Sequence, residues 1–509
     1  MTSSPADETS PARAATPRKS ILAQTAKGAG WTIGWRFATR LVGFCSTFML
    51  VRLLTPEDFG IVSLATGFFE ALDAVTAFGV EGAIIRVDRA DRAIYDAGFT
   101  INVCRGAVIT VILLVSAVPV AGFFGNAHLT NVIYVMSAGW AISSLQNVGM
   151  IEFRRSLAFD KEFKIQIIPR LAALAVTIPA AFVWHSYWAL AAGIVSTKTL
   201  TVILSYVMHP YRPRLGVAGM AQIFGFSFWE WMIGLLSLLG GRADTLIIGR
   251  LLGAGSVGVY GVGGEIASLP SSEIVAPLCR ALFSGFVAER REGTDGSATL
   301  LRVLAVMALL TFPLSVGLSL VAYPVIKIGF GVDWLAAVPL VQVLGVSSAI
   351  GMFSAAGVAL FSAHAWLRTI LWITAIATTL RITLLLLLIP KYGLLGGACA
   401  AAVVGVVQET VYLGIAMRRL RIRVLAVLAS VFRPLMAVAC MAAILAWSGL
   451  GWSNWDGGGA ELGLNLASAA GLGAIVYCAT LTGLWFVMGW PAGAEADLLS
   501  VINRVLRRA

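Results

Sequence analysis

The stretch Ala107–Gly122, with the sequence AVITVILLVSAVPVAG, contains no charged residue. It lies within a longer apolar run, residues 95–122. A helix that crosses the hydrocarbon core of a bilayer needs roughly 20 mostly apolar residues, and this run is long enough. The stretch therefore predicts a membrane-spanning helix.

The whole chain repeats this pattern. Of its 509 residues, 58% are hydrophobic and only 12% are charged, whereas soluble domains carry about 25% charged residues. We predict an all-α integral membrane protein with about 14 transmembrane helices. The predicted spans cover residues 29–52, 58–83, 95–122, 128–150, 166–184, 187–208, 221–247, 256–286, 300–326, 334–362, 366–389, 393–416, 424–448 and 463–489.

The distribution of basic residues predicts the orientation of these spans, because Lys and Arg accumulate in cytoplasmic loops. If the N-terminus is cytoplasmic, the basic residues fall in cytoplasmic loops one after another, and few remain outside. Basic residues on the predicted inner side include Arg86, Arg89, Arg92, Arg154, Arg155, Lys161, Lys164, Arg212, Arg214, Arg290, Arg291, Arg368, Arg418, Arg419, Arg421 and Arg423. The opposite side holds little beyond Arg52, Arg250, Lys327 and Lys391. The pattern requires an even number of spans with both termini cytoplasmic, and twelve is the competing count. It also explains the net charge of +11 without nucleic-acid binding.

An internal repeat indicates two lobes. Arg52-Leu53-Leu54 is followed by Gly60, and Arg250-Leu251-Leu252 is followed, at the same spacing, by Gly258. Many transporters consist of two such halves with the substrate path between them. We expect a disordered cytoplasmic tail over 1–28, a six-helix lobe over 29–208, a second over 209–416, and a terminal helix pair with a tail over 417–509.

Five basic residues within the spans are candidates for a substrate cavity, since charges at bilayer depth are costly and often functional. They are Arg36, Arg40, Arg105, Lys198 and Arg381. A cationic cavity would attract an anionic substrate, because guanidinium matches phosphate geometry. The alternative is that these charges form structural ion pairs or extend to the membrane surface, as we expect for Arg433 near a span end.

Four acidic residues within the spans are candidates for ion coupling or for ion pairs with these cations: Glu70, Asp73, Glu230 and Glu265. Glu70 and Asp73 are three residues apart, so they share a helix face. If the first two spans form a hairpin, these acids could neutralise Arg36 and Arg40.

The sequence contains none of several motifs of enzymes and nucleotide-driven pumps. It has no phosphate-binding G-x-x-x-x-G-K-[ST] loop, no H-E-x-x-H and no G-x-S-x-G. The six cysteines lie within apolar spans and include no C-x-x-C pair, so we expect neither a metal site nor a cofactor. We predict a transporter that hydrolyses no ATP, and not an enzyme.

The segment around the first predicted outside loop resembles a known family. Gly34-Trp35-Arg36 and the run VRLLTPEDFG at 51–60, with Gly79, Glu81 and Ile84-Ile85-Arg86, are similar to bacterial polysaccharide transporters. These belong to the multidrug/oligosaccharidyl-lipid/polysaccharide exporter superfamily and include Wzx-type flippases. The resemblance is strong over roughly residues 30–90. The second lobe departs from it, since Gly253-Ala254-Gly255-Ser256 stands where the first has Thr-Pro-Glu-Asp.

The resemblance implies fourteen helices and transport of undecaprenyl-diphosphate-linked oligosaccharides from the inner to the outer leaflet of the bacterial inner membrane. It implies a role in exopolysaccharide, O-antigen or capsule synthesis, transport driven by an ion gradient, and partnership with a polymerase and a chain-length regulator. Alternatives are a lipid II flippase and a drug/cation antiporter. A membrane glycan polymerase or acyltransferase is the alternative of another class, but the longest outside loop offers only Asp456 and Glu461 as acids.

Overall fold

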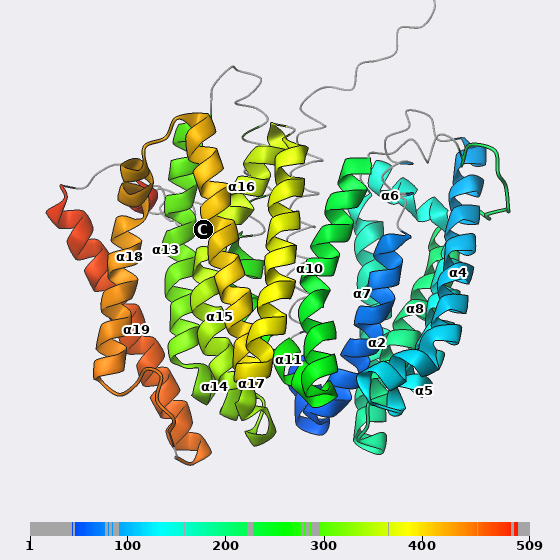
Figure 1. Cartoon of the computed structure of the whole chain (residues 1–509), viewed down its shortest axis with the longest axis horizontal. Helices are drawn as coiled ribbons and strands as arrows, with labels where there is room; N and C mark the ends of the chain where they lie inside the picture. Colours follow the sequence, from blue (N-terminus) through cyan, green and yellow to red (C-terminus); the bar gives the residue numbers. More distant parts are fainter. Residues whose placement is uncertain are drawn as a thin grey trace, which may run out of the picture.

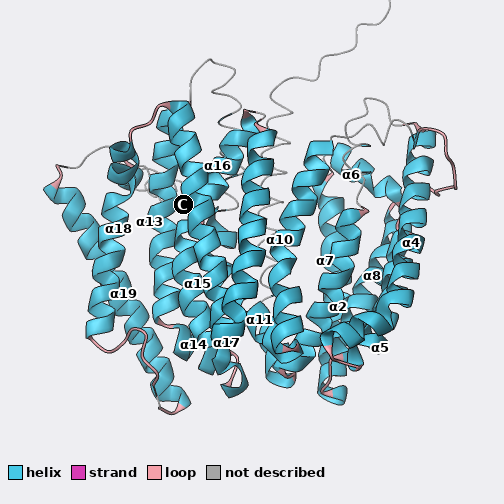
Figure 2. Cartoon of the chain, in the orientation of Figure 1, coloured by secondary structure: helices cyan, strands magenta, loops and turns pink. Residues whose placement is uncertain are grey.

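The described part of the chain is helical throughout. The computed structural model describes residues 46–76, 91–156, 158–220, 228–275, 296–364, 366–455, 457–489 and 493–496, with the single residues Gly43, Val80, Ile84, Cys279 and Phe286. Figure 2 shows helices joined by loops, and no strand, in these ranges. Eight of the described helices are long and apolar enough to cross a membrane, judged by length and composition. The predicted all-α membrane architecture is confirmed.

The first bundle contains the helices on the right of Figure 1. They are α2 (Pro56–Val75), α4 (Arg92–Phe124), α5 (His128–Ser144), η1 (Val148–Met150), α6 (Ile151–Arg155), α7 (Phe159–Trp184) and α8 (Trp188–Met208). The Thr-Pro-Glu-Asp run forms the start of α2. Thr55 and Asp58 exchange hydrogen bonds in a capping box, and Pro56 occupies the first turn, where its missing N–H is not needed. Asp58 also accepts a hydrogen bond from the backbone N–H of Tyr187 at 2.7 Å, which ties α2 to the start of α8.

The second bundle lies at the centre of the same view. It comprises α10 (Phe228–Leu252), α11 (Ala254–Pro270), η2 (Ser271–Val275), α13 (Ser297–Leu320), α14 (Ala322–Gly329), η3 (Val332–Ala337), α15 (Val338–Ile350), α16 (Met352–Ala363) and α17 (Leu367–Leu420). The long segment α17 is two helices, because Gly393 adopts φ 58° and ψ −139° at the turn between them. These correspond to the predicted spans 366–389 and 393–416.

The predicted span 334–362 is not one continuous helix. It divides at Gly351 into α15 and α16. The buried carboxylate of Glu409 accepts a hydrogen bond from the backbone N–H of Ser354. This bond satisfies a first-turn donor of α16 that a continuous helix would satisfy internally.

The terminal pair consists of α18 (Val424–Trp447) and α19 (Gly459–Val487), which pack on each other and, at the left edge of Figure 1, against α13 and α14. Arg433 in α18 does not extend to the surface, so that prediction is wrong. Its side chain is buried, and its guanidinium donates to Glu495 at 2.8 Å. A buried arginine needs a carboxylate partner, and the chain supplies one after α19.

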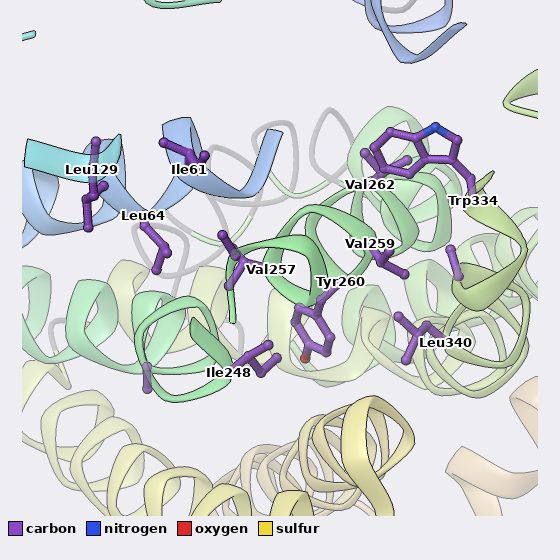
Figure 3. Close-up of a cluster of buried hydrophobic side chains, with 14 of the residues drawn as sticks. Ile61, Leu64, Leu129, Ile248, Val257, Val259, Tyr260, Val262, Trp334 and Leu340 are labelled. Atoms are coloured by element: carbon purple, nitrogen blue, oxygen red, sulfur yellow. The ribbon is translucent and has the colours of Figure 1, made fainter. Parts of the chain in front are cut away.

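A shared hydrophobic core joins the two bundles. Figure 3 shows Ile61 and Leu64 of α2 beside Val257 of α11 and Ile248 of α10. The same cluster includes Trp334, whose indole N–H donates to the carbonyl of Val51 at 3.1 Å. Across this core α2 packs against both α10 and α11.

The two copies of the internal repeat contact each other within this interface. A Cβ atom at Gly60 would overlap the carbonyl oxygen of Ala254, and one at Gly258 would overlap the carbonyl oxygen of Pro56. Pro56 and Ala254 are the first residues of α2 and α11, and each glycine follows one turn later. The contact is therefore reciprocal, and only glycine lets the helices approach so closely.

The opposite end of the first bundle is here called the arginine-rich face, which includes Arg92, Arg154 and Arg212. The segment after α8 folds back onto the start of α4 there, where Tyr211 donates to Asp96 and Arg92 donates to the carbonyl of Arg212. Burial and the bond to Asp96 raise the pKa of the Tyr211 hydroxyl above its usual range. In Figure 1 this face, marked by α6, lies at the top, and the contact between α2 and α11 lies toward the bottom.

Candidate substrate cavity

A cavity of about 610 Å³ opens in the first bundle, and α6 places it toward the arginine-rich face. Amides and hydroxyls from Asn102, Gln146, Gln166 and Thr201 line it, together with aromatic and charged side chains. Such a lining can hydrogen-bond to many hydroxyl groups while offering apolar surface to ring carbons. Its chemistry suits a polar organic ligand such as a sugar.

Arg105 of α4 lies in the wall of this cavity. Its guanidinium forms an ion pair with Asp73, and its Nε donates to the hydroxyl of Thr76 at 3.0 Å. A further bond of 2.9 Å reaches the carbonyl of Asp73. Its Nη1 donates to no described residue. Arg105 therefore combines a fixed orientation with donors that a ligand phosphate can use.

The arginines in the lining have carboxylate partners. Arg105 pairs with Asp73, and Arg154 pairs with Glu162 at 2.7 Å. The described lining is thus balanced in charge and not strongly cationic. An anionic ligand would have to compete with Asp73 for the guanidinium, or add to it at Nη1, which has no acceptor among the described residues.

Lys198 of α8 contacts an aromatic pair beside the cavity. Its ammonium nitrogen lies 3.6 Å from the centroid of the Trp140 ring, a cation–π geometry. The Trp140 ring stacks on Phe69, with centroids 3.3 Å apart and planes 6° from parallel. Asp73 and Glu70 are the acids that interact electrostatically with Lys198. The buried indole nitrogen of Trp140 has no hydrogen-bond partner among the described residues, so it remains a donor in the cavity wall.

Glu70 is one helical turn from Asp73 but has a partner in the other bundle. Its carboxylate forms an ion pair with Arg242 of α10. Both side chains are about one-third exposed, so water still reaches the pair. Asp73 therefore belongs to the cavity, whereas Glu70 connects the bundles at its border.

Arg381 forms an ion pair within the second bundle. Its Nε and Nη2 donate to the two oxygens of Asp244 at 2.8 and 2.5 Å, and the Tyr260 hydroxyl donates to the same carboxylate at 2.8 Å. Asp244 is only 4% exposed. This network ties α17, α10 and α11 together, and it lies apart from the cavity of the first bundle.

The other predicted site residues either are not described by the structure or lie away from the cavity. Arg36 and Arg40 lie outside the described residues, and the side chain of Glu230 is not described. Glu265 is exposed on α11, lines a small recess, and has no ion partner among the described residues. The cavity thus brings together Arg105 and Asp73 of the predicted set, with Lys198 and Glu70 at its edge.

The aromatic and amide part of the cavity was not predicted from the sequence. Trp140, Phe69 and Asn102 come from three helices, and in a membrane protein such residues are routine on any helix. The one available signal was the set of amides, Asn102, Gln146 and Gln166, in or beside the predicted third to fifth spans. Buried polar groups in a bundle interior are costly and favour a functional interpretation.

Comparison with known proteins places this chain in a family. Residues 49–339, more than half of the chain, match the family described as "Polysaccharide biosynthesis protein". The teichuronic acid biosynthesis protein TuaB of Bacillus subtilis is 24% identical over 64% of this chain and 68% of its own length. The lipopolysaccharide biosynthesis protein WzxC of Escherichia coli is 23% identical over 66% of this chain and 69% of its own.

Solved structures share the fold. The lipid II flippase MurJ, in an inward closed conformation, superposes with a TM-score of 0.66 at 12% identity, over 90% of this chain and 99% of MurJ. An inward-facing transporter of the multidrug resistance MATE family superposes with a TM-score of 0.62 at 15% identity, over 75% of this chain and 94% of the other. At these identities the similarity establishes the fold alone.

Proposed function

Because this chain belongs to the polysaccharide biosynthesis protein family, we propose that it is a flippase for lipid-linked oligosaccharide repeat units. The substrate is an undecaprenyl-diphosphate-linked oligosaccharide, which moves from the inner to the outer leaflet for assembly into exopolysaccharide, O-antigen or capsule. The related proteins TuaB, WzxC and the succinoglycan biosynthesis transport protein ExoT are named for the synthesis or transport of surface polymers.

The observation that supports this proposal most is the cavity of the first bundle. It combines amides and hydroxyls for sugar hydroxyls with the Trp140 ring and with one arginine, Arg105, whose Nη1 donates to none of the described residues. Guanidinium can bind a phosphate with two parallel hydrogen bonds. Arg36, Arg40 and Lys198 are the further cations that we propose for the diphosphate.

Transport proceeds by alternating exposure of this cavity. The described contacts between the bundles extend from Gly60 and Gly258 to the ion pair of Glu70 with Arg242. The cavity lies farther along, toward the arginine-rich face. We therefore infer a state closed on the side of the glycine contact. The diphosphate and oligosaccharide of the substrate would enter the cavity from the arginine-rich face and leave it after the contact between α2 and α11 opens.

The membrane orientation follows from the positive-inside rule. We propose that the arginine-rich face is cytoplasmic, that both termini are cytoplasmic, and that the protein resides in the bacterial inner membrane. Glu230 and Glu265 are proposed to bind the coupling ion. A polymerase and a chain-length regulator are proposed to act on the product.

The proposal is tested in a strain that lacks this gene, by measuring surface polysaccharide and the leaflet location of undecaprenyl-linked oligosaccharide. We expect loss of the polymer with the intermediate retained in the cytoplasmic leaflet. An intermediate that reaches the outer leaflet and stays unpolymerised would contradict translocation and would favour a membrane polymerase.

A further inference from the structure

Arg250 and Arg52 occupy equivalent positions in the two copies of the repeat, and each guanidinium lies over a phenylalanine ring, but only Arg52 has hydrogen-bond acceptors among the described residues. Arg52 donates to the carbonyls of Gly329, at 3.2 Å, and Ile328, at 2.5 Å, where α14 ends. The Arg250 guanidinium is exposed and lies over the Phe123 ring, 5.0 Å from its centroid. Among the described residues, Arg250 has neither a hydrogen-bond acceptor nor a carboxylate partner.

Arg250 lines an apolar groove between the bundles. The groove has a volume of about 580 Å³, and α2 and α4 supply one wall, including Phe68 and Phe124. The other wall comes from α10 and α17, including Leu246 and Leu386. Leu386 is 53% exposed, and Arg250 is the one charged residue among the groove's lining residues.

An apolar groove that is open at the protein surface and is lined by a single cation, with no partner in the described part of the chain, matches an amphiphile with an anionic head. At membrane depth, the available amphiphiles are lipids, and Arg250 in the last turn of α10 lies at a helix end, where headgroups begin. Basic side chains at the membrane boundary attract anionic headgroups.

We propose that this groove binds an anionic phospholipid of the surrounding bilayer. The phosphate accepts hydrogen bonds from the Arg250 guanidinium, and an acyl chain lies along the groove. Because the walls come from both bundles, a bound lipid bridges them beside the contact between α2 and α11. It therefore stabilises the state that is closed on that side. This inference does not depend on the identity of the transported substrate.

The test is native mass spectrometry of the full chain released from nanodiscs of phosphatidylcholine alone or of an equal mixture with phosphatidylglycerol. We expect wild-type protein to retain phosphatidylglycerol selectively. Retention should fall roughly tenfold in Arg250→Gln, as expected for loss of charge-assisted hydrogen bonds. Leu386→Trp, which fills the groove, should reduce retention similarly.

Two matched variants control for the loss of an exposed positive charge and for the addition of a bulky side chain. Lys391→Gln removes another exposed cation, in α17 two residues before the turn at Gly393, and Leu387→Trp adds the same bulk at a neighbouring residue that does not line the groove. Both should retain phosphatidylglycerol as wild type does. If Arg250→Gln and Leu386→Trp retained as much phosphatidylglycerol as the wild type, the proposal would be overturned. Retention of lipid by the wild type without headgroup selectivity would also overturn it. Selective retention of added undecaprenyl-linked glycan in place of phosphatidylglycerol by the wild type, lost in Leu386→Trp, would also overturn it and would assign the groove to the transported lipid.

Discussion

Gly60 and Gly258 are equivalent residues of the two repeats, and each lies against the first residue of the other's helix. The backbone of Ala254 occupies the space where a side chain at Gly60 would lie, and the backbone of Pro56 does the same at Gly258. The two halves therefore close on each other through a symmetric contact between backbones. Such a contact forms only when the bundles meet on this side, so it is suited to open and close during transport.

Adding one methyl group at either glycine should disfavour this closed state. Overpacking of a tight contact costs about 1–3 kcal/mol, which would shift the population toward the open state by roughly tenfold. In a background without the six natural cysteines, Gly60→Ala or Gly258→Ala should accelerate labelling of an Ala254→Cys reporter, which is buried in this contact, by a membrane-impermeant maleimide.

Two alanine substitutions on the same helices serve as controls. A Cβ at Gly67 of α2 would make an ordinary contact of 3.5 Å with Thr245, and one at Gly261 of α11 would meet nothing within 4 Å. Gly67→Ala and Gly261→Ala should leave the labelling rate unchanged. If all four variants label alike, the glycine contact does not control access.

Removal of the Arg105 side chain should impair polymer export. Arg105→Ala leaves Asp73 unpaired in the cavity wall and removes the donors proposed for phosphate. We expect at least a tenfold loss of surface polymer at normal protein level, and Arg105→Lys should restore little, because lysine lacks the planar fork. Arg170→Ala, at an exposed site on α7 outside the cavity lining, should export normally.

Arg36 and Arg40 are predicted to act in the same cavity. The double variant Arg36→Ala, Arg40→Ala should lose export while the protein remains in the membrane. Quantitative immunoblotting of membranes and assay of surface polymer would check this. Wild-type polymer output from a well-expressed double variant would exclude these arginines from the substrate path.

The ion pair between Glu70 and Arg242 should behave as a reversible link between bundles. Because both side chains are partly exposed, the pair contributes at most about 1 kcal/mol. Glu70→Arg and Arg242→Glu should each reduce export through repulsion of like charges, and the two together should recover it. A double variant no better than the worse single variant would show that the residues act separately.

The network of Asp244, Arg381 and Tyr260 should act mainly on stability. Asp244→Asn leaves a largely buried guanidinium without its counter-charge, and we expect a loss of about 3–5 kcal/mol. Tyr260→Phe removes one hydrogen bond and should cost about 1 kcal/mol. Thermal unfolding of the purified protein in detergent would rank the variants. If Tyr260→Phe lost more stability than Asp244→Asn, Asp244 would not be the centre of the network.

The sequence was informative about the membrane spans and less so about the contacts between residues of different spans. Charge-free runs such as Ala107–Gly122 predict a span because they lie within apolar segments long enough to cross the hydrocarbon core. The Thr-Pro-Glu-Asp run, which indicated the family, is the capping box of α2 in the structure. The break at Gly351 was not predicted, and the acceptor for the Ser354 N–H beside it, Glu409, comes from a later helix.

Ion pairs were the hardest feature to predict. Glu70 and Asp73 share a face of α2, yet one pairs with Arg242 of the other bundle and one with Arg105. Spacing along one helix cannot specify which distant helix packs against it. For the same reason, the burial of Arg433 against Glu495 was missed. The proposed pairing of Glu70 and Asp73 with Arg36 and Arg40 falls partly outside the described residues.

The most direct measurement of the central claim is translocation of undecaprenyl-linked oligosaccharide in proteoliposomes that contain only the purified protein. A fluorescent substrate in the inner leaflet would be quenched by an external reagent as it crosses. We predict quenching with wild-type protein under an ion gradient, unchanged quenching with Gly261→Ala, and strongly reduced quenching with Arg105→Ala. No difference between wild-type liposomes and protein-free liposomes under any imposed gradient would contradict the account.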